Sequence, residues 1–251
     1  MQFAFKPALT VATLIGLAIL ISLGTWQVQR LAWKEDLIAR VEARTNAEPI
    51  EFAEAYRRWL EGEDMEYTPV WVQLVYNHPR EAHVFGSLEG VAGWYVFTPA
   101  SFHKRQPDFI DEDAVLYINR GFTADTFKAR ETRPDSLIAA DENDTLPVVT
   151  GLLRTPQESP AIAGALTPQN DPARNEWYVR DPMVFAGAAG VKALPVWVDS
   201  SGSENPAAWP KGNTTRLDFN NRHLEYALTW FGLAATLLVV FFAFSLKRRD
   251  A

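Results

Sequence analysis

Two long apolar runs interrupt an otherwise polar chain. Residues 8–28 and 226–246 are each 21 residues long, and neither contains Lys, Arg, Asp or Glu. At the helical rise of about 1.5 Å per residue, each would extend roughly 31 Å, which matches the hydrocarbon thickness of a bilayer. Because backbone amides in lipid must pair within their own segment, we predict two transmembrane helices. We favour a retained first helix over a cleaved signal peptide, because no small-x-small cleavage site follows it.

The region between the two runs, residues 30–222, contains short apolar segments of a different kind. They are rich in β-branched and aromatic residues, and turn residues separate them, which predicts strands. Asn119-Arg120-Gly121 is one of these turn signals, and it predicts a reversal of the chain after the strand at 115–119. The predicted strands are residues 67–76, 83–85, 94–102, 115–119, 146–154, 177–180 and 196–199.

Helix patterns are fewer in this region. Residues 37–44 continue the first helix pattern, and 52–60 have amphipathic spacing. A helix over 182–189 is predicted from Asp181-Pro182 at its start and Gly190 at its end. The predicted fold class is therefore an α+β membrane protein. It has a two-helix transmembrane hairpin flanking an antiparallel β-rich extracytoplasmic domain with a few short helices, and the domain is a partly closed barrel or a sandwich.

Charge and composition narrow the function classes. Residues 30–225 carry 20 basic and 30 acidic side chains, so no basic surface indicates a nucleic-acid partner. The absence of cysteine excludes thiolate catalysis, disulfides and cysteine-bound metals. Lys6 and the basic residues 247–249 favour cytoplasmic termini, whereas basic residues on the domain side favour the opposite. The charge rule weakens for long loops, and we expect cytoplasmic termini and a periplasmic domain.

The chain contains few signals of catalysis. It has no His-Glu-x-x-His, Gly-x-Ser-x-Gly or phosphate-binding glycine loop, so we predict that it is not an enzyme. His78, His83 and His103 are interpreted as surface residues, with a metal pair at the first two as the alternative. Acidic residues within 108–113 predict a solvated loop, with a weak cation site as the alternative.

His223 stands out because it lies where the polar region meets the second apolar run. An ionisable group at a membrane boundary is costly, so we treat it as a candidate functional residue. On a helix, His223, Ala227 and Trp230 share one face, with Tyr226 beside them. An imidazole above a small residue, flanked by aromatic rings, suits a planar ligand such as haem, whose iron accepts imidazole as an axial ligand. The alternative is a histidine that only contacts lipid headgroups.

The end of the first apolar run emerges on the same side of the membrane as His223. Trp26, Arg30 and Trp33 are spaced to share one helix face. Arg30 and Arg222 are candidates to pair with haem propionates, and the alternative is a generic interfacial anchor. Within the run, Ala12 and Gly16 form a small-xxx-small pair that would allow close helix packing, unless it is only background composition.

Four segments follow one another along nearly the whole chain: LGTWQVQRLAWK from Leu23, GWYVFTP from Gly93 with LYINRGF from Leu116, NEWYVRD from Asn175, and HLEYALTWFGLA from His223. Together these segments resemble the surfeit-locus-one (Shy-one) family, and the two membrane-proximal segments are the more specific. One departure is Gln73-Leu74, where the family usually has a glycine nearby.

The resemblance implies an assembly factor for cytochrome c oxidase in the bacterial inner membrane. Such a protein would bind haem A as cargo and assist its delivery or insertion into oxidase subunit I, with haem A synthase as a further partner besides membrane lipid. It implies that His223 is the axial ligand of the haem iron. The other candidate cofactor-binding residues are then those expected around His223: Tyr226, Trp230, Arg30, Arg222 and Trp26. The alternative function is a two-span periplasmic ligand-binding or sensor protein that acts through a membrane partner.

Overall fold

The computed structural model describes residues 2–3, 6–133, 148–156, 167–202, 208–215 and 221–247. The chain forms two compact units. Met1–Glu42 and Leu217–Ala251 make up the first unit, and Ala43–Arg216 make up the second.

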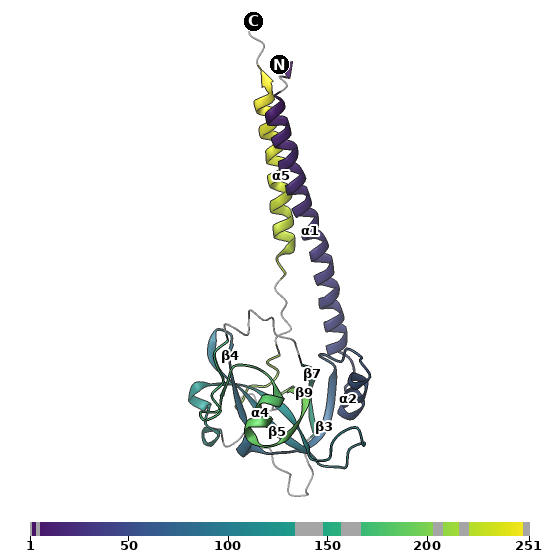
Figure 1. The fold of residues 1–251 in the computed structure, drawn as a ribbon, viewed down its shortest axis with the longest axis vertical. Coiled ribbons are helices and arrows are strands. Elements are labelled where there is room, and N and C mark those ends of the chain that lie inside the picture. Colours follow the sequence, from purple (N-terminus) through teal and green to yellow (C-terminus); the bar gives the residue numbers. More distant parts are fainter. Residues whose placement is uncertain are drawn as a thin grey trace. The chain divides into compact units, whose positions relative to one another are not determined.

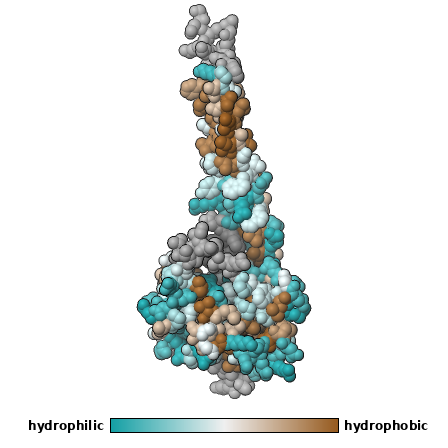
Figure 2. Space-filling view, viewed as in Figure 1, coloured by the Kyte–Doolittle hydropathy of each residue, from teal (hydrophilic) through white to brown (hydrophobic). Residues whose placement is uncertain are grey.

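The first unit is a pair of long antiparallel helices, α1 (Pro7–Thr45) and α5 (His223–Ser245) (Figure 1). Both are long and apolar enough to cross a membrane, and Figure 2 shows apolar side chains gathered along the pair. Short strands β1 (Gln2–Phe3) and β10 (Leu246–Lys247) pair at its end. Two apolar helices flanking a β-rich domain are thus confirmed, whereas the span limits 8–28 and 226–246 remain predictions.

Glycines let α1 approach α5 closely. A Cβ added at Gly24 would lie 2.6 Å from the ring of Phe231, and one added at Gly16 would lie 3.0 Å from Leu237. Small residues at such crossings allow the tight van der Waals packing that holds helices together in lipid. Ala12 is exposed, so the predicted Ala12–Gly16 pair is wrong at Ala12, because the helix face that meets α5 continues from Gly16 to Gly24 instead.

The second unit is a β-barrel. Five strands close a ring in the order β3-β7-β9-β6-β5, because β5 also pairs with β3, while β4 and β8 extend the sheet beyond β5 and β2 pairs with β3. Most pairings are antiparallel, as predicted, but β2–β3, β4–β8 and β6–β9 are parallel. The strands are β2 (Ile50–Glu51), β3 (Pro69–Tyr76), β4 (Ala82–Leu88), β5 (Val91–Phe102), β6 (Ala114–Ala124), β7 (Val148–Arg154), β8 (Glu176–Trp177) and β9 (Lys192–Ser200).

Two apolar clusters stabilise the barrel from its two faces. One contains Leu116 and Ile118 and is joined by helix α2 (Phe52–Leu60), and the other contains Tyr117 and is joined by helix α4 (Pro182–Ala189). Alternate residues of β6 therefore enter different clusters, and the strand is buried on both faces. The described part of the unit also contains the single-turn helices η1 (His78–Arg80), η2 (Asp125–Phe127) and η3 (Arg130–Thr132).

The predicted turn at Asn119-Arg120-Gly121 is wrong, because these residues lie inside β6. Gly121 has a φ of 118°, and a Cβ there would lie 1.9 Å from the carbonyl oxygen of Lys211. Phe122 and Lys211 exchange backbone hydrogen bonds of 2.8 and 2.7 Å. The glycine therefore allows two chain segments within the domain to approach closely, and it does not mark a reversal of the chain.

A buried ionic cluster ties the barrel strands together. Arg154 on β7 donates to Asp199 on β9 and to Glu66, at 2.7 Å in each case. Asp199 also accepts from Asn119 on β6 at 2.8 Å and from the Trp197 indole at 3.0 Å. Removing one partner from such a cluster leaves an uncompensated buried charge, which typically costs about 3–5 kcal/mol.

We predict that Gly24→Leu destabilises the helix pair, because the new side chain would overlap the Phe231 ring. Overpacking of this kind costs about 1–3 kcal/mol. The matched control is Gly232→Leu on α5, where an added Cβ meets no atom within 4 Å. Unfolding in mixed micelles of increasing SDS content, followed by tryptophan fluorescence, measures both. Equal stability of the two variants would contradict the packing described.

Candidate functional site

His223 is the first residue of α5, and its ring contacts a glutamine of α1. The distance from His223 Nδ1 to Gln27 Oε1 is 2.7 Å. Gln27 is only 8% exposed, whereas His223 is half-buried. The contact therefore joins the two helices of the first unit through polar side chains at the edge of their apolar packing.

This contact fixes which ring nitrogen of His223 is available for a ligand. An amide oxygen only accepts, so with the amide oriented as in the structure Nδ1 carries the proton. In a neutral imidazole, Nε2 then keeps its lone pair. Within residues 6–133 and 221–247, Nε2 has no hydrogen-bond partner. A nitrogen with a free lone pair on a half-buried ring can coordinate a metal.

Two aromatic side chains that are close in sequence to the His223–Gln27 contact are exposed. Trp26 is 54% exposed and Tyr226 51%, so both present ring surface that the helix pair does not use. Trp230 is half-buried, and Ala227 beneath His223 is buried. The predicted arrangement, a small residue below the imidazole with aromatic rings beside it, stays a prediction.

Two arginines supply positive charge on the same unit. The Arg30 guanidinium lies 3.9 Å from the centroid of the Trp33 ring, which confirms that these two residues share a helix face. Arg30 and Arg222 are exposed, and among the described residues neither forms an ion pair with a carboxylate. Glu225 is exposed as well, and its backbone oxygen accepts from the Thr229 hydroxyl at 2.8 Å.

Gln27 is the one residue of this arrangement that the sequence reasoning did not assign. It lies inside the predicted span 8–28, where an amide side chain is costly unless it is paired. The cost of an unpaired amide in an apolar span is the signal in the sequence that points to Gln27. The contact itself depends on the register between α1 and α5, which the sequence alone does not provide.

The donor set fits a haem. The imidazole has a free nitrogen, the adjoining aromatic rings offer apolar surface, and the two arginines can each pair with a carboxylate such as a propionate. The ligand role of His223 and the roles of Tyr226, Trp230, Arg30, Arg222 and Trp26 remain predictions.

His83 is not a surface residue as predicted. It is 7% exposed, and its Nε2 lies 2.9 Å from Glu81 Oε1, which also pairs with Arg133. Burial raises the pKa of Glu81, but the His83 hydrogen bond and the charge of Arg133 outweigh it and hold that pKa below its usual range. The group is a structural ion pair, and the part of the chain that the structure describes holds no cluster of three metal-binding side chains.

The other two histidines and the acidic loop also lie outside any metal cluster. His78 Nδ1 lies 3.2 Å from the Arg120 guanidinium, and His103 is exposed. In the loop, Asp111 is exposed and pairs with Lys192, which agrees with a solvated loop at this residue.

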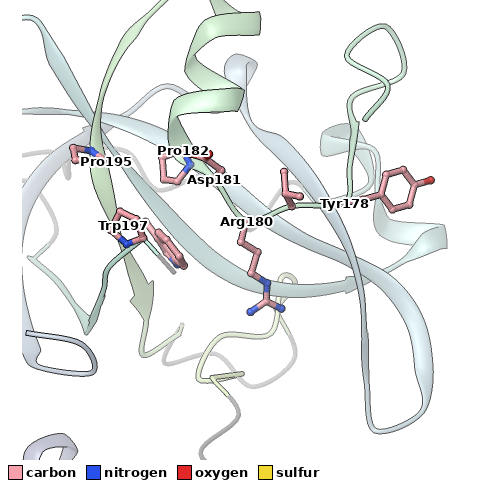
Figure 3. Close-up of a pocket in the computed structure, with 8 residues that line it drawn as sticks. Tyr178, Arg180, Asp181, Pro182, Pro195 and Trp197 are labelled. Atoms are coloured by element: carbon pink, nitrogen blue, oxygen red, sulfur yellow. The ribbon is translucent and has the colours of Figure 1, made fainter. Parts of the chain in front are cut away.

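The third family-like segment borders a cavity of about 320 Å³ in the second unit. Figure 3 shows Arg180 between Tyr178 on one side and Trp197 on the other. The Arg180 guanidinium lies 4.2 Å from the Tyr95 ring centroid, and Asp181 caps α4 by accepting from the Met183 amide at 2.9 Å. None of the predicted haem-binding residues lines this cavity.

Comparison with known proteins identifies relatives over most of the chain. The SURF1 family model matches residues 14–235. The mouse protein named Surfeit locus protein 1 is 31% identical over 242 residues, which cover 90% of this chain and 72% of the relative. The human protein of the same name is 31% identical over 237 residues, covering 88% and 72%. A SURF1-like protein of Dictyostelium discoideum is 24% identical over 261 residues, covering 90% and 92%.

Proposed function

The chain belongs to the SURF1 family of cytochrome c oxidase assembly factors, and on that basis we propose that it binds haem A as cargo and assists its delivery into oxidase subunit I. The observation that carries the proposal is the state of His223. Its Nδ1 is engaged by Gln27 at 2.7 Å, and its Nε2 is free within the described residues. A histidine that only contacted headgroups would not need a buried glutamine to orient it.

In this proposal His223 Nε2 would coordinate the haem iron. The exposed rings of Trp26 and Tyr226 would pack against the macrocycle, with Trp230 beside them, since flat aromatic surfaces bury well against each other. Arg30 and Arg222 would pair with the propionates through charge-assisted hydrogen bonds. A single protein ligand suits cargo, because one coordinate bond is easier to exchange than two.

The two apolar helices and the family membership support a membrane location, and the finer placement is part of the proposal. We place α1 and α5 across a bacterial inner membrane, with both termini in the cytoplasm and the barrel in the periplasm. The proposed partners are oxidase subunit I, which receives haem A, and haem A synthase, which would supply it. The chain acts by binding and release, and we propose no catalytic residue.

His223→Ala should abolish or strongly reduce haem A binding, because it removes the proposed iron ligand. Apo protein purified in detergent is titrated with haem A, and the absorption spectrum gives occupancy and ligation. His103→Ala is the matched control, since His103 is exposed in the second unit.

Full haem retention in the His223 variant would refute the ligand assignment. If the wild-type protein binds no haem A while it is folded, the periplasmic sensor alternative is favoured.

Arg30→Ala should weaken haem A binding without unfolding the barrel, because a propionate loses its charged partner. Such a contact is worth about 1.5–3 kcal/mol, or roughly a 10- to 100-fold change in Kd. Arg40→Ala on the same helix is the control, since Arg40 forms only an exposed pair with Asp36 at 3.0 Å. Equal affinities of the two variants would assign the Trp26–Trp33 face to anchoring instead.

The proposed topology can be tested because the chain has no native cysteine. Single cysteines are introduced at the exposed positions Glu112 in the barrel and Lys6 before α1. A membrane-impermeant maleimide applied to intact spheroplasts should label the first variant and label the second only after permeabilisation. The reverse pattern would overturn the periplasmic placement.

A further inference from the structure

We infer that Gln27 is a positioning residue that holds His223 in the Nδ1-protonated tautomer and so presents Nε2 as the metal-binding nitrogen. The inference rests on the proposed function, because it concerns the haem site of that proposal. It adds a residue from α1 to a site whose ligand comes from α5, so that the helix pair, and not α5 alone, forms the site.

The first step is the strength of the contact. Gln27 Oε1 and His223 Nδ1 are 2.7 Å apart, which is at the short end of the normal range for an N–H···O hydrogen bond. Gln27 is 8% exposed, and one turn earlier Gly24 packs against the Phe231 ring. In such apolar surroundings a hydrogen bond is stronger than in water, and an unpaired partner is costly.

The second step is what this hydrogen bond selects. A neutral imidazole exchanges between two tautomers, and only the one with the proton on Nδ1 has a lone pair on Nε2. An acceptor fixed against Nδ1 favours that tautomer. Without it, part of the population would carry the proton on Nε2, and the apparent affinity for a metal would fall in proportion to the competent fraction.

The third step concerns the bond to iron. Histidine ligands usually donate their second ring N–H to a neighbouring acceptor, which orients the ring and makes the ligating nitrogen more basic. Gln27 is the only such acceptor that the structure places on His223 within the described residues. Arg30 is stacked on Trp33, and Glu225 is exposed with its backbone oxygen bonded to Thr229.

The test begins with the apo protein, which separates the tautomer from haem binding. Full-length protein labelled with ¹⁵N-histidine in nanodiscs is examined by long-range ¹H–¹⁵N correlation NMR. The wild-type spectrum should show a protonated Nδ1 and an unprotonated Nε2 at His223. Gln27→Leu should lose this preference, and Gln27→Glu should keep it because the carboxylate still accepts. Gln29→Leu is the matched control, since Gln29 is exposed on the same helix.

The haem-bound protein supplies the second readout. Gln27→Leu should lower haem A affinity about 10- to 100-fold and lower the iron–histidine stretching frequency in the resonance Raman spectrum of the ferrous form. Gln27→Glu should restore both, and Gln29→Leu should match the wild type. Circular dichroism shows whether each variant is folded. If the Gln27→Leu variant does not fold, the Gln27→Glu variant still tests the inference.

A wild-type His223 protonated on Nε2, or a folded Gln27→Leu variant with unchanged tautomer and unchanged affinity, would overturn the inference. So would a glutamate variant that loses the wild-type tautomer. If apo His223 shows the expected tautomer but the wild-type protein binds no haem A, the positioning role of Gln27 toward iron is refuted together with the proposed function. The NMR result then identifies haem binding, and not the hydrogen bond, as the part that failed.

Discussion

The hydrogen bond between Gln27 and His223 is the contact on which the proposed site depends. Apolar side chains hold α1 and α5 together but do not determine which polar residues of the two helices meet. An amide and an imidazole at the edge of that packing must satisfy each other's hydrogen bonds. Their 2.7 Å contact sets which part of α1 faces the start of α5. Gly24 against Phe231 and Gly16 against Leu237 then allow the backbones to approach closely enough for the contact to form.

The barrel has a different physical basis. Its strands enclose one apolar cluster and carry a second on the outer face under α4, and the buried Arg154–Asp199 pair crosses between β7 and β9. Much of the third family-like segment serves this construction. Asn175 accepts from the Trp177 indole at 2.8 Å, and Asp181 caps α4. The third family-like segment thus contributes packing and capping to the barrel, whereas the two membrane-proximal segments supply His223 and Gln27.

The sequence predicted the elements whose signals are local. Helix α2 at Phe52–Leu60 and helix α4, with its caps at Asp181 and Gly190, agree with the structure, and the two apolar runs lie largely within the helices α1 and α5. Strand limits were less accurate: the predicted strand over 177–180 is observed as Glu176–Trp177, and the one over 146–154 as Val148–Arg154, with residues 146–147 outside the described residues. These limits depend on partners that are distant in the sequence.

Features that depend on distant partners could not be predicted. The parallel pairing of β6 with β9 joins segments about 80 residues apart, and the closure of β5 on β3 has no local signature. The burial of His83 is not predictable from the sequence, because nothing near it in the chain reveals that Arg133 joins Glu81 beside it. For the same reason His223 was found from its position at a membrane boundary, but its partner Gln27, 196 residues away, was not.

The most direct test of the central claim, that this helix pair carries haem A, is the haem content of the wild-type protein as cells make it. The full chain is purified in mild detergent from membranes of cells that synthesise haem A, and pyridine haemochrome spectroscopy gives the amount and type of haem per chain. The proposal predicts haem A approaching one per chain, with an absorption spectrum of the native protein, recorded before pyridine is added, that indicates histidine ligation. Folded protein from the same cells that carries no haem A, or only haem B without histidine ligation, would contradict it.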